Sequence, residues 1–176
     1  MQKTIISIDP GSKGFITVVN PKGSITFLSL ADNDTQSVSK FLDKVITEAG
    51  CYEWGVIAVM EEVHAILGSS AKATFNFGKV FGLLQGLLVG KHIPFHLVQP
   101  KEWQSCVWIN QDKVYDSKEV KDGVVRRVVN TKKTSINAAI RLFPHIDLRK
   151  TVKCKNIDDN KADSLLINEF ARRNNL

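Results

Sequence analysis

Four acidic residues stand where a strand or a helix is expected to begin or end: Asp9, Glu61, Asp159 and Asp163. The first two each follow an apolar run, and the last two are four residues apart in a helical pattern, so they share a helix face. Singly, each has an ordinary structural role as a turn former, a solvated strand end or a helix cap. Like charges at this helical spacing repel unless a cation lies between them. Together, the four residues indicate a site for a hard cation.

Magnesium prefers oxygen ligands and takes one or two carboxylates per ion. Two such ions, roughly 3.5–4 Å apart, can hold the attacking and leaving oxygens of a phosphodiester displacement. The charge of the chain supports a polyanionic substrate. Residues 1–88 hold 7 basic and 8 acidic residues, whereas residues 89–176 hold 17 basic and 10 acidic ones, so the second half carries the whole positive excess. The acidic cluster and the basic surface together predict a metal-dependent nuclease.

The hydrophobic pattern predicts the elements that must position these groups. Strands are expected over 4–9, 14–19, 24–30, 55–60 and 95–98, and helices over 35–49, 74–91, 132–143 and 159–173. The first three strands have tight connections and predict an antiparallel meander, and the whole order predicts an α/β fold with a mixed sheet. Residues 65–73 and 145–156 are expected to be loops. No helix can be placed in the charged stretch 101–130.

The expected helix over 74–91 carries glycine at every fourth position: Gly78, Gly82, Gly86 and Gly90. Each glycine costs a helix interior about 1 kcal/mol relative to alanine. Close approach of a second backbone would offset that cost. The second backbone belongs either to the chain's own sheet or to a second copy of the helix.

Length and composition exclude several classes of protein. A chain of 176 residues with 43% hydrophobic residues fits one domain with a core. No apolar run approaches the roughly 20 residues of a membrane span, and MQKTIISID lacks the regions of a signal peptide. Three widely spaced cysteines without CxxC spacing do not predict a disulfide framework. We therefore expect an intracellular protein without a membrane partner.

Six segments in order resemble the RuvC-type Holliday junction resolvases, and are most similar to the branch often carried by phages. They are IDPGSKG (8–14), VMEEVHA (59–65), FNFGKVFGLLQGLL (75–88), LVQPKEW (97–103), NTKKTSINAAIRLFP (130–144) and DDNKADSLLI (158–167). The resemblance implies one RuvC-like nuclease domain over 1–176 with a ribonuclease-H-like fold, a five-stranded mixed sheet flanked by helices. It also implies a homodimer that nicks four-way (Holliday) DNA junctions symmetrically in recombination and repair, in the cytoplasm of a bacterial cell or a phage-infected host.

By the same resemblance, Asp9, Glu61, Asp159 and Asp163 are the catalytic and metal-binding residues. They would hold two Mg²⁺ ions, for which Mn²⁺ can substitute. Two alternatives stay open, because Glu62 is adjacent to Glu61 and Asp158 is adjacent to Asp159. Neighbours on a strand face opposite sides, which favours only one of the first pair beside Asp9.

Five residues are candidate nucleic-acid contacts: His64, Lys72, Lys79, Lys132 and Lys133. The resemblance suggests that His64 stacks on exposed bases, and Lys132 or Lys133 can neutralise charge on the scissile phosphate. A surface histidine and a solvated helix start are the competing interpretations. Phe75 and Phe77 are expected in the core or a dimer contact, and Trp103 and Trp108 are expected to be structural.

Two other functions are compatible with the same residues. One is a related nuclease that acts on flaps, other branched DNA or RNA–DNA hybrids. The other is a non-catalytic nucleic-acid-binding protein on the same fold.

Overall fold

A computed structural model describes residues 2–62, 70–119 and 125–176 of the chain. Five strands form one mixed sheet in the order β3-β2-β1-β4-β5: β1 (Lys3–Ile8), β2 (Phe15–Val19), β3 (Ile25–Ser29), β4 (Gly55–Glu61) and β5 (Phe95–Val98). The first three strands are an antiparallel meander, and β4 and β5 run parallel to β1. The mixed α/β sheet expected from the sequence is therefore confirmed.

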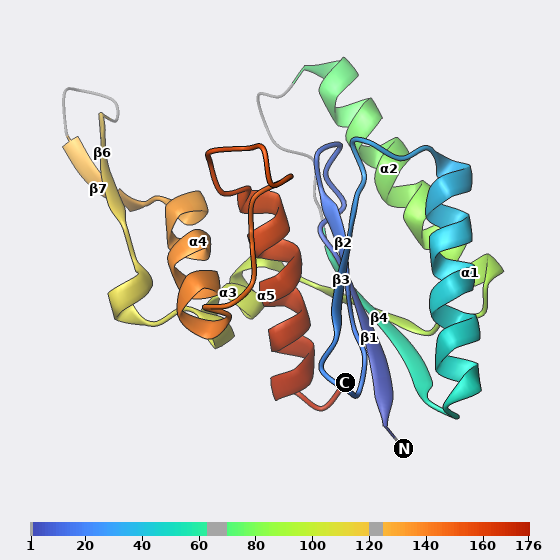
Figure 1. Cartoon of the computed structure of the whole chain (residues 1–176). Helices are drawn as coiled ribbons and strands as arrows, with labels where there is room; N and C mark the ends of the chain where they lie inside the picture. Colours follow the sequence, from blue (N-terminus) through green and yellow to red (C-terminus); the bar gives the residue numbers. More distant parts are fainter. Residues whose placement is uncertain (1, 63–69, 120–124) are drawn as a thin grey trace.

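Helices cover both faces of this sheet (Figure 1). Helices α1 (Thr35–Cys51) and α2 (Ala71–Gly90) lie on one face, and α4 (Thr131–Leu142) and α5 (Asp159–Arg173) lie on the other. Alternation along β1 sends Ile6 and Ile8 into the core under α1 and α2, while Ile5 packs in the core with α5. On β4, Met60 faces the first core and Val59 the second. The two faces of the sheet thus carry separate cores.

Helix α5 is the most deeply buried helix that the structure describes. Every residue from Lys161 to Ala171 is buried except Asp163, which is half-buried. The Ser164 and Thr17 hydroxyl oxygens lie 2.6 Å apart, and the Asn168 amide donates to the Ile5 carbonyl at 2.9 Å. These bonds join α5 to β2 and β1. They fix the position of α5 on the sheet.

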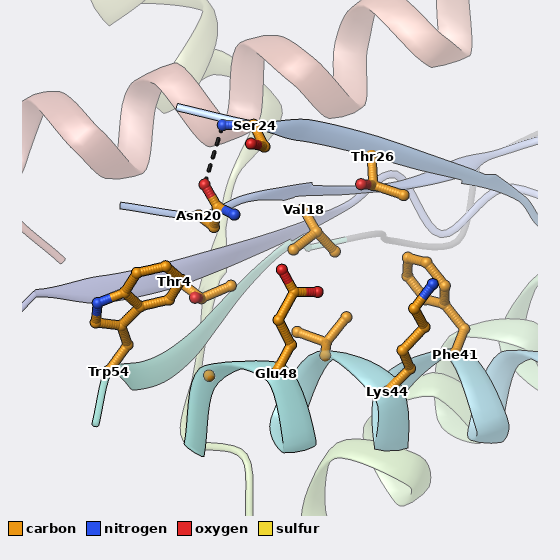
Figure 2. Close-up of a pocket in the computed structure, with 11 residues that line it drawn as sticks. Thr4, Val18, Asn20, Ser24, Thr26, Phe41, Lys44, Glu48 and Trp54 are labelled. Carbon is orange, nitrogen blue, oxygen red and sulfur yellow. Dashed lines mark hydrogen bonds between the residues drawn. The ribbon is translucent and has the colours of Figure 1, made fainter. Parts of the chain in front are cut away.

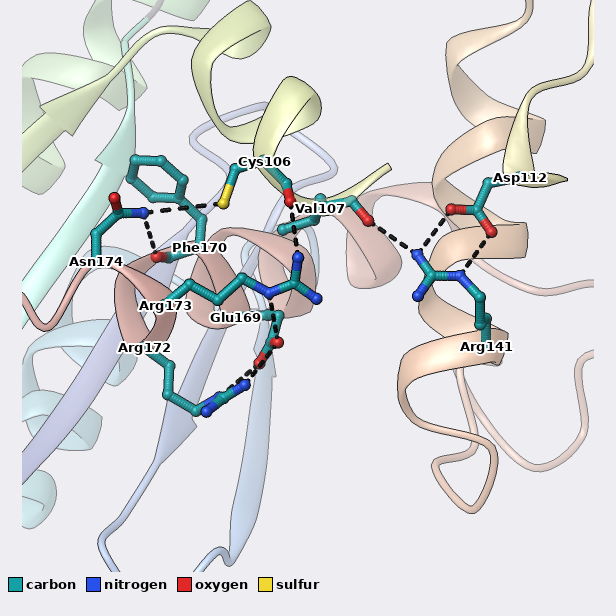
Figure 3. A network of polar contacts seen from close by, with 9 residues as sticks. All are labelled: Cys106, Val107, Asp112, Arg141, Glu169, Phe170, Arg172, Arg173 and Asn174. Carbon is teal, nitrogen blue, oxygen red and sulfur yellow. Dashed lines mark hydrogen bonds and ion pairs between the residues drawn. The ribbon is translucent and has the colours of Figure 1, made fainter. Parts of the chain in front are cut away.

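Helix α3 (Pro100–Val107) follows β5 and is held at its end by two arginines from other helices (Figure 3). Arg173 of α5 donates to the Cys106 carbonyl at 2.7 Å, and Arg141 of α4 donates to the Val107 carbonyl at 2.9 Å. Arg141 also forms a two-point ion pair with the buried Asp112. Side chains from two other helices, α4 and α5, therefore fix the end of α3.

The stretch 101–130, where the sequence pattern placed no helix, contains α3, the short 3-10 helix η1 (Asn110–Asp112) and a separate two-stranded ribbon. The ribbon consists of β6 (Tyr115–Glu119) and β7 (Val125–Val129). Helix α2 begins at Ala71, so the end of the expected loop over 65–73 is helical. No helix within the described ranges is long and apolar enough to cross a membrane.

The glycines of α2 do not pack against the chain's own sheet. A Cβ atom added at Gly78, Gly82, Gly86 or Gly90 would meet nothing within 4 Å. One of the two explanations for the glycine stripe is therefore wrong, because the buried positions of α2 are Leu84 and Leu88 on the opposite side of the helix. Phe75, which was expected in the core or in a dimer contact, is 72% exposed and is therefore not a core residue.

Candidate active site at the carboxyl ends of β1 and β4

The residue that follows β1 is held by a tight turn. The Asp9 amide donates to the Phe15 carbonyl at 3.0 Å, and the Gly11 amide donates to Asp9 Oδ1 at 3.3 Å. Gly14 is required here, because a Cβ atom at that position would lie 2.0 Å from the Asp9 carbonyl oxygen. The turn fixes the Asp9 carboxylate at the end of the strand, where only 8% of the residue is exposed.

Glu61 is the last residue of the neighbouring strand. The parallel register pairs Ile8 with Met60, so Asp9 and Glu61 are the next residues on adjacent strands. The Trp103 indole N–H of α3 donates to Glu61 Oε1 at 2.9 Å. Alternation puts Glu61 on the α5 side with Val59, and it puts Glu62 on the other side with Met60.

The first turns of α5 bring two more carboxylates. Asp163 has one buried oxygen, Oδ1, with no hydrogen-bond partner among the described residues. Asp159 forms an ion pair with Lys132 of α4, with Oδ2 and Nζ 2.8 Å apart. Asp158 has a different task, because its side chain accepts hydrogen bonds from the backbone N–H groups of Asn160 and Lys161 and caps the helix.

The carboxylates interact electrostatically. Burial, and then the negative charge of Glu61, raise the pKa of Asp9 to about 7, and the charges of Asp159 and Asp158 add to this although the Gly11 hydrogen bond opposes it. Burial also raises the pKa of Asp163 well above its usual range, and the charges of Asp9, Glu61 and Asp159 act in the same direction. Burial raises the pKa of Glu61 against the effect of the Trp103 hydrogen bond. Three partly buried acidic groups, at the ends of β1 and β4 and on α5, thus lie close enough for their charges to act on one another.

The donor set fits a hard divalent cation. All the acidic groups are oxygen ligands, and a buried carboxylate oxygen without a donor is a position where a cation would replace the missing partner. Among the described residues, no three acidic, histidine or cysteine side chains already stand in the arrangement of a metal site. The chemistry of the residues therefore fits the ion, but the described side chains are not spaced as the ligands of one ion.

The lysines expected to contact nucleic acid fall into two groups. Lys132 and Lys133 are in the first turn of α4, and the charge and hydrogen bond of Asp159 raise the pKa of Lys132. Lys72 and Lys79 are exposed on α2, across the sheet from α4. Lys79 lines a surface hollow with Ser12, which belongs to the turn after Asp9. His64 lies outside the described residues.

Trp103 and Ser135 contribute to the site although sequence reasoning did not include them in it. Trp103 was expected to be structural and is indeed 1% exposed, but its N–H also holds Glu61. The Ser135 side chain of α4 lowers the pKa of the Asp163 carboxyl against the effect of burial. Both residues contact acids that are distant in sequence, so local spacing gives no signal for them.

A second hollow lies between α1 and the sheet (Figure 2). Its wall includes Thr4, Lys44, Glu48 and Trp54. Thr4 stands near the start of β1, whereas Asp9 follows its end. This hollow is therefore separate from the acidic site.

Comparison with known proteins gives a likeness of fold. No family model and no curated protein matches the sequence. Among solved structures, Thermus thermophilus RuvC shares 14% identity at a TM-score of 0.50, covering 98% of this chain and 96% of the other. A structure described as T. thermophilus RuvC in complex with Holliday junction substrate shares 11% identity at a TM-score of 0.49, covering 97% and 95% of the two chains. The chain therefore has a ribonuclease-H-like fold similar to that of RuvC.

Proposed function

We propose that this protein is a magnesium-dependent, structure-specific endonuclease that cuts branched DNA, with the four-way junction as its substrate. What supports the proposal is that Asp9 and Glu61 occupy the ends of adjacent strands and that the charges of both act on the buried Asp163 carboxyl. The ion pair of Asp159 and Lys132 joins the first turns of α5 and α4. The ribonuclease-H-like fold supports the reaction class. The choice of a four-way junction rests on the six RuvC-like sequence segments.

Asp9, Glu61, Asp159 and Asp163 would hold two Mg²⁺ ions, whose chemistry would be to lower the pKa of a bound water and to stabilise the leaving oxyanion. Asp159 is preferred to Asp158 because the Asp158 carboxylate is engaged as the helix cap. Glu61 is preferred to Glu62 because Glu61 shares the α5 side of the sheet with Asp9.

Two other side chains support this site. Trp103 fixes one oxygen of Glu61, which leaves the carboxylate in one orientation. The Lys132 side chain is 72% exposed while it contacts Asp159, so its ammonium group can also face a phosphate that lies over the site. Lys132 would thereby bring positive charge to the scissile phosphate.

The test is cleavage of an immobile four-way junction with and without Mg²⁺, with the cut positions mapped on all four strands. We expect paired nicks in opposed strands that require Mg²⁺ or Mn²⁺. Asp9→Asn removes the negative charge of one carboxylate but keeps the shape of the side chain. Nicking should therefore fall below detection, while junction binding stays close to that of the wild-type protein. Asp43→Asn, an exposed acid on α1, is the matched control and should cut normally.

Other results point to other functions. Faster cutting of flaps or RNA–DNA hybrids than of junctions would make the protein a nuclease of another substrate class. Binding without nicking in either metal would indicate a non-catalytic nucleic-acid-binding protein. Nicking by Asp9→Asn at the wild-type rate would overturn the assignment of the site.

We further infer that the protein works as a homodimer through α2. The glycine stripe of this helix is open, and Phe75 and Val89 on the same side are 72% and 62% exposed. Glycines four apart let two helix backbones approach closely. Two sites related by a two-fold axis can nick two opposed strands of a junction.

A further inference from the structure

The ribbon β6–β7 projects from the body of the protein on the side of α4 (Figure 1). Its strands pair with each other from Tyr115–Val129 to Glu119–Val125 and form no part of the main sheet. Nine of its ten described strand residues are exposed, and Val129 is half-buried. An isolated two-stranded ribbon is marginally stable in water, so an element of this kind gains order from a partner.

Cations gather on the ribbon in an arrangement that is unfavourable without an anion. Lys118 lies directly opposite Arg126 in the register, so their side chains point to the same face. Like charges directly opposite each other destabilise a strand pair. Neither side chain forms an ion pair with any acid in the part of the chain that the structure describes.

The other face of the ribbon carries a third cation. Arg127 lies over the Tyr115 ring, 4.6 Å from its centroid, and Tyr115 is 44% exposed. Two acids belong to the same strands. Asp116 shares the face of Lys118 and Arg126 and accepts from the Asn130 amide at 2.6 Å, whereas Glu119 lies on the face of Arg127. One face thus carries two cations and one acid, and the other carries one of each. The face of Lys118 and Arg126 is therefore the more cationic one.

The base of the ribbon is fixed beside the acidic site. The Asn130 side chain accepts from the Lys133 amide as the cap of α4, and its own amide contacts Asp116 of β6. The Val114 amide, just before β6, donates to the Thr134 hydroxyl of α4. Two residues after Asn130 comes Lys132, the ion-pair partner of Asp159. The ribbon thus begins within one helical turn of a residue that contacts the site.

We propose that the β6–β7 ribbon binds duplex DNA that flanks the cut, with Lys118 and Arg126 on the phosphates of one arm of the branched substrate. This inference rests on the proposed nuclease function. A two-stranded ribbon fits the major groove of B-DNA. Five residues per strand reach about 17 Å, which matches roughly five base pairs of duplex.

A second copy of the ribbon is the competing partner, because both strands have free edges that can pair with another strand. The charges oppose that arrangement, because pairing of two ribbons would bring Lys118 and Arg126 of one copy close to the same cations of the other copy. DNA phosphates supply the missing negative charge instead. Duplex DNA is therefore the partner that the ribbon's chemistry fits.

The test measures binding without a divalent ion, so that it does not depend on cleavage. Lys118→Ala/Arg126→Ala is compared with Lys40→Ala/Lys44→Ala, which removes two exposed cations from α1 across the sheet. Both are titrated with a four-way junction and with a linear duplex between about 50 and 200 mM salt. A footprint on the junction locates the protected base pairs.

We expect the ribbon variant to bind at least about tenfold more weakly near 100 mM salt, with a salt slope reduced by about 2, and the α1 variant to match the unchanged protein. The ribbon variant should also lose roughly five protected base pairs on the arm. The charge-preserving Lys118→Arg/Arg126→Lys variant should restore binding, which separates loss of charge from loss of folding.

Equal affinity and equal salt slopes for the two alanine variants would overturn the inference. A changed oligomeric state of the ribbon variant in sedimentation, with unchanged DNA affinity, would also overturn it and assign the ribbon to a second copy. If no protein nicks DNA but binding is lost only in the ribbon variant, the nuclease proposal falls, while the assignment of Lys118 and Arg126 to duplex phosphates stands. If nicking is seen but the ribbon variant binds normally, only the ribbon inference falls.

Discussion

At the scale of single residues, the carboxyl group of Asp9 is placed where burial favours its protonated form. Its pKa is about 7 in the folded chain against 3.8 for the ordinary side chain. Between these values the folded state binds more protons than the unfolded state, so folding becomes less favourable as pH rises. The stabilising contribution is fully present below about pH 4 and is lost as pH rises through about 7.

We therefore expect Asp9→Asn to change the pH dependence of stability of the metal-free protein. Relative to this variant, the unchanged protein should lose up to about 4 kcal/mol of unfolding free energy between pH 4 and pH 8, because each pKa unit is worth about 1.4 kcal/mol. Urea unfolding across this range measures the difference. The comparison cancels acids such as Asp112, whose pKa is lowered by Arg141 and which act in the opposite direction.

A difference between the two proteins that does not vary with pH would contradict the burial of the Asp9 charge. A second measurement compares the free energy of unfolding with and without Mg²⁺. If the ion binds the ionised carboxylates, it should stabilise the unchanged protein more at pH 8 than at pH 5 and stabilise Asp9→Asn much less.

The sequence predicted the positions of the acidic residues because strand ends and helix spacing are local signals. Ile8 and Met60 end apolar runs, so the residues that follow them were expected at the sheet edge, where the structure places Asp9 and Glu61. The contact between Trp103 and Glu61 joins residues 42 positions apart and depends on how α3 is placed. No local pattern encodes such a contact.

At the scale of elements, α3 positions the Trp103 side chain beside Glu61. Arg141 and Arg173 hold the carbonyls at its end (Figure 3). Trp103, on the buried side of α3, donates its N–H to Glu61. The indole of Trp108 packs edge-on to Trp103, but its N–H is buried without a hydrogen-bond partner among the described residues. The two tryptophans therefore form a matched pair that differs in the bond to Glu61.

Trp103→Phe should lower the nicking rate by about tenfold to a hundredfold and raise the Mg²⁺ concentration needed for half the maximal rate, because Glu61 loses its orienting donor. Trp108→Phe removes an N–H that bonds nothing and should leave the Mg²⁺ requirement unchanged. Rates are measured over a Mg²⁺ titration at saturating junction. Equal shifts of the Mg²⁺ requirement in both variants would show that Trp103 acts only by filling the core.

The elements that sequence reasoning predicted share a strong hydrophobic period. Helix α5 buries Leu165, Leu166 and Phe170 as its spacing indicated. The ribbon has no such period, because both of its faces are solvated and YDSKE is a polar stretch. Helix α3 has only eight residues, too few for a period to stand out. An element can be predicted from sequence when burial of one face gives it a hydrophobic period. The ribbon has no buried face, and α3 is too short for the period to be recognised.

At the scale of the whole molecule, the open side of α2 is the surface that a second copy would cover. Gly82 and Gly86 leave space around their backbones, and a Cβ atom at either position would meet nothing in the single chain. Alanine at these positions should stabilise the isolated helix by about 1 kcal/mol each. In a dimer with close backbone approach, the same methyl groups would hold the helices apart.

We therefore expect Gly82→Ala/Gly86→Ala to raise the melting temperature of the single chain while weakening the dimer by at least about tenfold in sedimentation equilibrium. Gly50→Ala in α1, where an added Cβ is equally unhindered, is the control and should leave dimerisation unchanged. The weakened dimer should convert paired nicks in a junction into single nicks, because each cut then depends on a separate encounter. A glycine variant that dimerises as tightly as the unchanged protein would mean that the stripe lies outside the interface, and the two-fold arrangement of active sites would need another surface.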